Sequence, residues 1–138
     1  MQENHSRSTK GVLRGLHYQL PPKSQDKLLR VVKGEILDIV VDIRKSSSTF
    51  GKWTGETLSE KNKKQIWIPK GFAHGFLVLS EIAEVIYKTT DYYAPQYERC
   101  IRWDDPKLSI DWNLKGLNLL LSNKDKKGEL IQNLQVFD

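Results

Sequence analysis

The sequence predicts an all-β protein in which short strands form a sandwich or a barrel. Apolar runs of strand length recur along the chain and are separated by turns that contain Gly and Pro. No long stretch shows the 3.6-residue periodicity of an amphipathic helix. Many short strands with tight turns at regular spacing are typical of sandwiches and barrels.

The first clear pair of strands is a hairpin. Residues 27–33 form one apolar run, Gly34 marks the turn, and residues 35–43 form the second run. In the second strand Asp38 and Asp42 share one face, because strand side chains alternate with period two. Two carboxylates on one face indicate that this face borders a wet cavity.

Further strands are expected in the middle of the chain, and loops toward its end. The expected strands cover residues 53–58, 64–68, 76–79 and 84–90. A loop at residues 94–98 contains Pro95, and a turn follows at residues 104–106. After Lys124 the chain is polar, so we expect an irregular segment with one short helix from Glu129.

Length and composition indicate one domain. With 138 residues, 38% hydrophobic residues and four Trp, we expect a single domain over residues 1–138. No stretch approaches the roughly 20 apolar residues that cross a bilayer, and the polar start MQENHSRSTK shows no signal peptide. The single Cys100 cannot form an internal disulfide and fits a reducing cytoplasm. We expect it to be a structural cysteine, because no activating pattern surrounds it.

The charge of the chain favours an anionic partner. The formal net charge is +5 and the isoelectric point is about 9.3. The basic run Lys61-Asn62-Lys63-Lys64 is flanked by turn-like residues, which is typical of a solvated loop. No recognition helix or RNA-binding signature is present. We therefore expect a small anionic ligand rather than nucleic acid.

Arg14 and His17 lie close together in a mixed strand. Because they are three residues apart, they fall on opposite sides of an ideal strand. Gly15 between them indicates a bulge that would re-aim one of the two side chains.

His74 follows a Pro-Lys-Gly turn and is flanked by Gly71 and Gly75, which allow close approach of backbone or ligand. A metal site is not expected, because the chain has only His5, His17 and His74 and they show no HxH or HxxxH spacing. Downstream lies a cluster of tyrosines.

Tyr87 and Tyr93 are six residues apart and share a face if the strand continues. One phenol is suited to serve as an acid and the other ring as a stacking platform. Tyr92 is expected to pack against a strand face.

Five segments together resemble the dTDP-4-dehydrorhamnose 3,5-epimerase family. They run in order from about Gln2 to Asp125 and read NHSRSTKGVLRGLHYQ, KLLRVVKGEILDIVVDIRKSS, TFGKW, IWIPKGFAHGFLVLS and YKTTDYYAP. The resemblance implies a cupin-type jelly-roll or β-barrel, here with a short irregular or helical C-terminal segment. It also implies a metal-independent, cofactor-free isomerase, homodimeric and cytoplasmic, that serves L-rhamnose and cell-surface polysaccharide biosynthesis.

The resemblance also implies a role for each matching residue. His17 matches the general base, Asp125 the carboxylate that orients it, Tyr87 the acid on the opposite face, and Lys27 a lysine near the keto oxygen. The implied substrate contacts are Arg14 and His74 for substrate and phosphate, Tyr93 for thymine stacking, Gln2 and Asn4 for the nucleotide, Glu98 and Lys124 as further ligand positions, and Asp38 as a carboxylate lining the site.

The implied chemistry fits these residue types. The expected substrate, dTDP-4-keto-6-deoxy-D-glucose, has a C4 ketone that acidifies the protons at C3 and C5. A neutral histidine with a pKa near 6.5 can accept such a proton, and Lys27 can stabilise the enolate. Inversion needs a proton returned from the other face, which makes His17 and Tyr87 a suitable pair.

The match has one departure, and several alternatives stay open. Family members carry an earlier segment with further strands, so we expect those N-terminal strands to be absent here; Glu3 also stands where the family has Asp. The alternatives are a 3-only or 5-only epimerase, a UDP-sugar substrate, a truncated inactive nucleotide-sugar-binding module, and a sugar-binding or structural cupin. A binding module has no need of a base and an acid together, and a sugar-binding or structural cupin has no need of Arg14 and Lys27 together.

Overall fold

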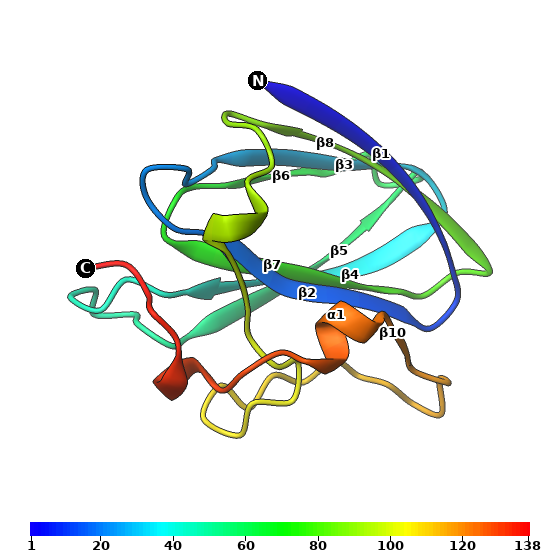
Figure 1. Ribbon diagram of the computed structural model, residues 1–138. Helices are drawn as coiled ribbons and strands as arrows, with labels where there is room; N and C mark the ends of the chain where they lie inside the picture. The colour runs from blue at the N-terminus through cyan, green and yellow to red at the C-terminus, as the bar shows by residue number, and fades with distance from the viewer.

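The protein consists almost entirely of β-strands, as predicted (Figure 1). We describe it from a computed structural model that covers residues 1–138. The ten strands are β1 (Gln2–Thr9), β2 (Val12–Gln19), β3 (Lys27–Lys33), β4 (Glu35–Asp42), β5 (Trp53–Ser59), β6 (Gln65–Ile68), β7 (Phe72–Val78), β8 (Ile82–Thr89), β9 (Glu98–Cys100) and β10 (Leu120–Leu121). One short helix, α1 (Asn123–Lys126), and two 3-10 turns (Pro95–Tyr97 and Ile131–Asn133) complete the structure.

The strands form two sheets that face each other (Figure 1). The small sheet has the strand order β1-β8-β3-β6. The large sheet has the order β10-β2-β7-β4-β5, and β9 also pairs with β2. All pairs in both sheets are antiparallel except β10 with β2. The predicted sandwich is therefore confirmed. The predicted hairpin of residues 27–43 is wrong: β3 and β4 do not pair, because the turn at Gly34 leads the chain from the small sheet to the large one.

One end of the space between the sheets is filled by apolar side chains. Strand alternation points one side chain in two into this space, and eight buried residues meet there. Each of the larger ones stabilises the fold by about 1.5–3 kcal/mol relative to an exposed position. The eight are Leu29, Val31, Ile36, Leu58, Phe76, Val78, Ala83 and Val85.

A second core lies on the outer face of the large sheet. It combines strand residues such as Leu13, Ile39 and Leu77 with Trp112 and Ile131 from the C-terminal third of the chain. The large sheet is thus anchored by apolar contacts on its outer face. Its inner face can therefore carry polar side chains without loss of the core.

Several predicted elements differ from the structure. The short helix expected from Glu129 is a 3-10 turn, Ile131–Asn133. The α-helix α1 was not predicted, and it begins after Ser122, whose hydroxyl accepts the backbone N–H of Asp125. This hydroxyl cap satisfies one of the free N–H groups of the first turn. No helix of the structure is long and apolar enough to cross a membrane.

Strand β1 was not predicted, because polar residues occupy both of its faces. The strand expected at residues 76–79 begins earlier, at Phe72. The expected wet cavity beside Asp42 is wrong: this carboxylate is buried and accepts hydrogen bonds from Arg44, Ser47 and Thr49. Burial raises the pKa of Asp42, but these donors outweigh it and hold the pKa well below its usual value.

Candidate active site

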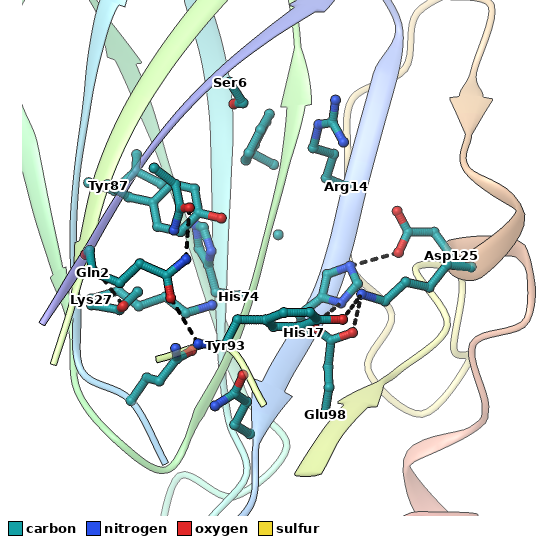
Figure 2. Close-up of a pocket in the computed structure, with 18 of the residues that line it drawn as sticks. Gln2, Ser6, Arg14, His17, Lys27, His74, Tyr87, Tyr93, Glu98 and Asp125 are labelled. Atoms are coloured by element: carbon teal, nitrogen blue, oxygen red, sulfur yellow. Dashed lines mark hydrogen bonds and ion pairs between the residues drawn. The ribbon is translucent and has the colours of Figure 1, made fainter. Parts of the chain in front are cut away.

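A cavity of about 490 Å³ occupies the other end of the space between the sheets (Figure 2). The small sheet contributes inward residues of β1, β3 and β8, and the large sheet contributes those of β2, β7 and β9. Eleven of the twelve site residues expected from the sequence line this cavity: Gln2, Asn4, Arg14, His17, Lys27, His74, Tyr87, Tyr93, Glu98, Lys124 and Asp125. The twelfth, Asp38, lies behind His74 and contacts it.

The predicted bulge at Gly15 is confirmed. Arg14 pairs with Phe76 and His17 pairs with His74, so β2 advances three residues while β7 advances two. This one-residue excess lets Arg14 and His17 face the same cavity. Gly15 has φ +120°, and a Cβ at this position would lie 2.6 Å from the Gly75 Cα atom. Only glycine fits this close approach.

His17 and Asp125 form a hydrogen-bonded pair at one side of the cavity. The distance from His17 Nε2 to Asp125 Oδ1 is 2.7 Å, and the carboxylate is almost fully buried. A carboxylate accepts only, so Nε2 carries the proton and Nδ1 keeps its lone pair. Burial lowers the pKa of His17, but the hydrogen bonds and charges of Asp125 and Glu98 outweigh it and raise the pKa above 6.5.

Asp125 itself is fixed from two directions. Its backbone N–H donates to the Ser122 hydroxyl at 3.1 Å, and its carboxylate accepts a hydrogen bond from the backbone of Gly15. Burial raises the pKa of Asp125, but the hydrogen bond and charge of His17, together with the Gly15 backbone donor, outweigh it and lower the pKa. The carboxylate therefore stays ionised and holds the imidazole in one tautomer.

A second set of charges lies beside the other nitrogen of His17. Glu98 Oε2 is 3.7 Å from His17 Nδ1, and Glu98 also pairs with the ammonium group of Lys124. Lys124 Nζ lies 3.3 Å from the Tyr93 hydroxyl and 5.3 Å from the centroid of its ring. Tyr93 is half exposed at the mouth of the cavity, and its backbone N–H donates to Gln2 Oε1 at 2.9 Å.

The small sheet supplies a different kind of group. Burial raises the pKa of Tyr87, with the positive charge of Arg14 acting in the opposite direction, so the phenol stays protonated at neutral pH. Burial lowers the pKa of Lys27, against the opposing charges of Glu98 and Asp38. A protonated phenol and a lysine amine thus line the cavity from the sheet opposite His17.

His74 forms a second histidine–carboxylate pair in the floor of the cavity. Its Nε2 lies 2.7 Å from Asp38 Oδ2, and both side chains are buried. The other carboxylate oxygen of Asp38 is buried and has no hydrogen-bond partner. This pair fixes the imidazole of His74 against the cavity.

Several residues that line the cavity were not predicted from the sequence, and Ser6 and Gln25 are examples. A signal for Ser6 was present, because it has the same parity in β1 as Gln2 and Asn4. Ser8 continues this row, and its hydroxyl accepts hydrogen bonds from Arg14 Nε and Nη2 at 3.2 and 3.0 Å.

Cys100 lies directly behind the His17–Asp125 pair. Its Sγ is 3.7 Å from Asp125 Oδ1, and burial raises the pKa of the thiol to about 12. The thiol is therefore protonated at neutral pH, consistent with the structural role expected for it. The ligand atoms of His17, Cys100 and Asp125 lie within 4.8 Å of one another.

Comparison with known proteins gives a consistent result. Residues 1–133 match the family described as dTDP-4-dehydrorhamnose 3,5-epimerase. The chain is 57% identical over 137 residues to the Pseudomonas aeruginosa dTDP-4-dehydrorhamnose 3,5-epimerase, which covers 99% of this chain and 75% of the relative.

Two solved structures are also similar. A 3,5-epimerase from Legionella pneumophila in complex with dTDP-4-keto-L-rhamnose is 52% identical, has a TM-score of 0.92 and covers 98% of this chain and 71% of its own. A 3′-monoepimerase from Streptomyces bikiniensis in complex with dTDP-quinovose is 34% identical, with a TM-score of 0.90, over 95% of this chain and 66% of its own. The expected cupin-type fold is confirmed by these neighbours.

The close approach of β2 and β7 leads to the first prediction. A Cβ on Gly75 would lie 2.6 Å from the Arg14 carbonyl oxygen, so Gly75→Ala must push the bulge outward. We expect a loss of about 1–3 kcal/mol in the free energy of unfolding and a disturbed His17. Urea unfolding would measure the former. Gly55→Ala is the matched control, because its Cβ meets only side-chain atoms, the nearest being Ile39 Cδ1 at 3.1 Å. Equal stability of the two variants would contradict the prediction.

Proposed function

This chain belongs to the dTDP-4-dehydrorhamnose 3,5-epimerase family, and we propose that it inverts C3 and C5 of dTDP-4-keto-6-deoxy-D-glucose to give dTDP-4-keto-L-rhamnose. One observation carries the proposal. A histidine base on the large sheet and a protonated tyrosine on the small sheet face each other across one cavity. A sugar ring between the sheets would have one face toward each.

His17 acts as the base. Its Nδ1 atom is free of hydrogen-bond partners and keeps a lone pair, because the proton is held on Nε2 by Asp125. Nδ1 accepts the proton from C3 or C5, and the ionised Asp125 stabilises the imidazolium that forms. A positioned base contributes about 10²–10⁴-fold to the rate.

Proton loss places negative charge on the C4 oxygen, and the cavity holds cations to stabilise it. Lys27 is the donor we assign to this oxygen, because its amine lines the cavity in surroundings where charge interactions are strong. One preorganised donor of this kind contributes roughly 2.7–4 kcal/mol. The carbanion would otherwise be too unstable for a histidine base.

Tyr87 returns the proton from the opposite face. Its raised pKa keeps the phenol protonated until the enolate forms. Base and acid belong to different sheets, so removal and return occur on opposite faces of the ring, which is what inversion requires. His74, held by Asp38, borders the same region as a further substrate contact.

The remaining residues bind the nucleotide. Arg14 presents a guanidinium fixed by Ser8 and suits bidentate binding of a diphosphate. Tyr93 at the cavity mouth offers a ring for the thymine base, close to Gln2, Asn4, Glu98 and Lys124. A dTDP-sugar is therefore the substrate class that the cavity fits.

A 3-only epimerase is the second candidate function. The structural neighbour from Streptomyces bikiniensis is a 3′-monoepimerase with a TM-score of 0.90. Its identity to this chain, 34%, is lower than the 57% of the Pseudomonas aeruginosa 3,5-epimerase. We therefore favour inversion at both carbons.

Isotope exchange tests the proposal. With the dTDP-4-keto-6-deoxy sugar in heavy water, NMR should show deuterium entering at both C3 and C5. His17→Ala should abolish exchange and leave dTDP binding nearly intact, whereas Tyr87→Phe should permit exchange and impair inversion. Exchange at C3 alone would make the protein a monoepimerase. Unchanged exchange in His17→Ala would remove His17 as the base, and no exchange in the wild type would indicate a binding module.

The His17–Asp125 pair predicts a pH dependence. Because His17 must be neutral and its pKa is raised, kcat/KM should fall as pH drops through an apparent pKa above 6.5. Asp125→Asn removes a raising influence, so this acid limb should move to lower pH while the plateau falls about 10²-fold or more. Asp104→Asn, an exposed carboxylate paired with Arg102, should leave the profile unchanged. An unshifted acid limb in Asp125→Asn would refute the assignment.

We further propose that residues 1–138 act as one domain that functions as a homodimer in the cytoplasm. One domain is supported by a site that draws on β1 through α1. A reducing compartment is supported by the unpaired Cys100, and cell fractionation tests it. Dimerisation is supported by apolar side chains on the outer face of the small sheet, where Trp67 is 57% exposed and Val32 is 36% exposed.

Light scattering tests the dimer. The wild-type protein should have twice the chain mass of 16.0 kDa, and Trp67→Glu should shift it toward the single-chain mass because a charge is buried at the contact. Phe50→Glu, at a 39% exposed residue away from this face, is the control. A single-chain mass for the wild type would overturn the proposal.

A further inference from the structure

A cluster of three different ligand types lies at the wall of the cavity. His17 comes from β2, Cys100 from β9 and Asp125 from α1, and their ligand atoms lie within 4.8 Å of one another. His17 and Cys100 are directly paired across the two strands. We propose that these three side chains form an inhibitory binding site for a thiophilic divalent cation such as Zn²⁺.

The donor set suits this class of cation. Zinc takes imidazole nitrogen, thiolate sulfur and carboxylate oxygen at about 2.0–2.3 Å, in a tetrahedral arrangement that places ligand atoms roughly 3.3–3.7 Å apart. Cys100 Sγ and Asp125 Oδ1 are already 3.7 Å apart. His17 Nε2 and Asp125 Oδ1, at 2.7 Å, need to separate by less than about 1 Å. Hard cations such as Mg²⁺ do not favour this set.

Three protein ligands leave one position open. His17 and Asp125 both line the cavity, so the fourth position faces it and would be filled by water or a substrate oxygen. Three ligands with one open position are a common arrangement for zinc outside closed structural sites.

The surroundings of His17 complete the site. A cation on Nε2 requires that the ring proton move to Nδ1, which is buried and has no hydrogen-bond partner. Glu98 Oε2 lies 3.7 Å from Nδ1, so a small approach would let it accept a hydrogen bond from the Nδ1–H group. Figure 2 shows Asp125 and Glu98 on either side of the imidazole ring. A carboxylate behind a metal-bound histidine is a recurring support of zinc sites.

Binding of the cation exchanges one proton for the metal ion. The thiol of Cys100 releases one proton to solvent and becomes the thiolate ligand, while the His17 proton only moves from Nε2 to Nδ1. The thiolate and the Asp125 carboxylate together neutralise the two positive charges of the cation. No oxidant, reductant or bond cleavage is involved.

The consequence is inhibition. With its proton on Nδ1, His17 has no lone pair left to accept a proton from the sugar, and Asp125 no longer orients it. Inhibition rests on the proposed role of His17 as the base, whereas binding of the cation does not. Cys100 takes no part in the proton transfers, so it can be changed while the rest of the site is kept.

Metal titration without substrate tests the site. Calorimetry with buffered Zn²⁺ should show one ion per chain, and Co²⁺ should give a thiolate-to-cobalt charge-transfer band in the near ultraviolet. Cys100→Ser keeps a hydroxyl donor and should abolish the band. It should weaken zinc binding by at least the roughly 10–100-fold that loss of a supporting partner costs a metal site. His5→Gln, which changes an exposed histidine paired with Glu84, should bind like the wild type.

The activity arm separates binding from function. Buffered Zn²⁺ should reduce exchange in the wild type, EDTA should restore it, and Cys100→Ser should resist inhibition while keeping its activity without zinc. Equal zinc affinity of the wild type and Cys100→Ser, or a missing cobalt band, would overturn the site. Binding with unchanged exchange would overturn inhibition. The cobalt band remains decisive even if the protein proves inactive on the dTDP-sugar.

Discussion

The extra residue at Gly15 is the constraint on which the site depends. Before the bulge Leu13 points to the outer core and Arg14 to the cavity; after it, Leu16 points outward and His17 inward. Strand side chains alternate strictly between the two faces of a sheet. Without the bulge, the residues after Gly15 would therefore point to the opposite faces, and either His17 would leave the cavity or Leu16 would leave the outer core. Gly75 on β7 leaves the space that the bulge needs. Two glycines in neighbouring strands therefore fix both the core and the position of the base.

A polar cavity between the two sheets reduces the apolar surface that can be buried there, so the protein has to bury apolar side chains elsewhere. Here the large sheet buries apolar side chains on its outer face as well, so its inner face is free to carry His17, His74 and Arg14. Several ionisable groups in the cavity are also arranged in pairs, as in Asp125 with His17 and Glu98 with Lys124. Pairing matters because an isolated buried charge would cost several kcal/mol. The same pairs raise the pKa of His17, while burial raises that of Tyr87, which separates the base from the acid.

The sequence predicted the parts of this arrangement that local pattern controls. The strands at residues 27–33 and 35–43, the turn at Gly34 and the bulge at Gly15 follow from alternation and from Gly positions. The pairing of those two strands does not, because local pattern cannot tell a hairpin from a turn that leads from one sheet to the other. The contact between His17 and Asp125 joins distant parts of the chain, so only the family resemblance pointed to it. β1 was not predicted, because its inner face lines a polar cavity and the strand therefore lacks the alternation of apolar and polar residues by which strands are recognised. The contact between Cys100 and Asp125 could not be predicted either, because it depends on the pairing of β9 with β2, which are far apart in the sequence.

The imidazole of His17 stands between two carboxylates, and the proton's location decides its chemistry. With the proton on Nε2, Asp125 holds it and Nδ1 is a base directed at the sugar. With the proton on Nδ1, Glu98 can accept it and Nε2 becomes a ligand beside Cys100. A change of tautomer alone would thus turn the His17 base into a metal ligand. The neighbouring Cys100 thiol, once deprotonated, is the kind of ligand that soft cations prefer, and binding of such a cation would stabilise that tautomer.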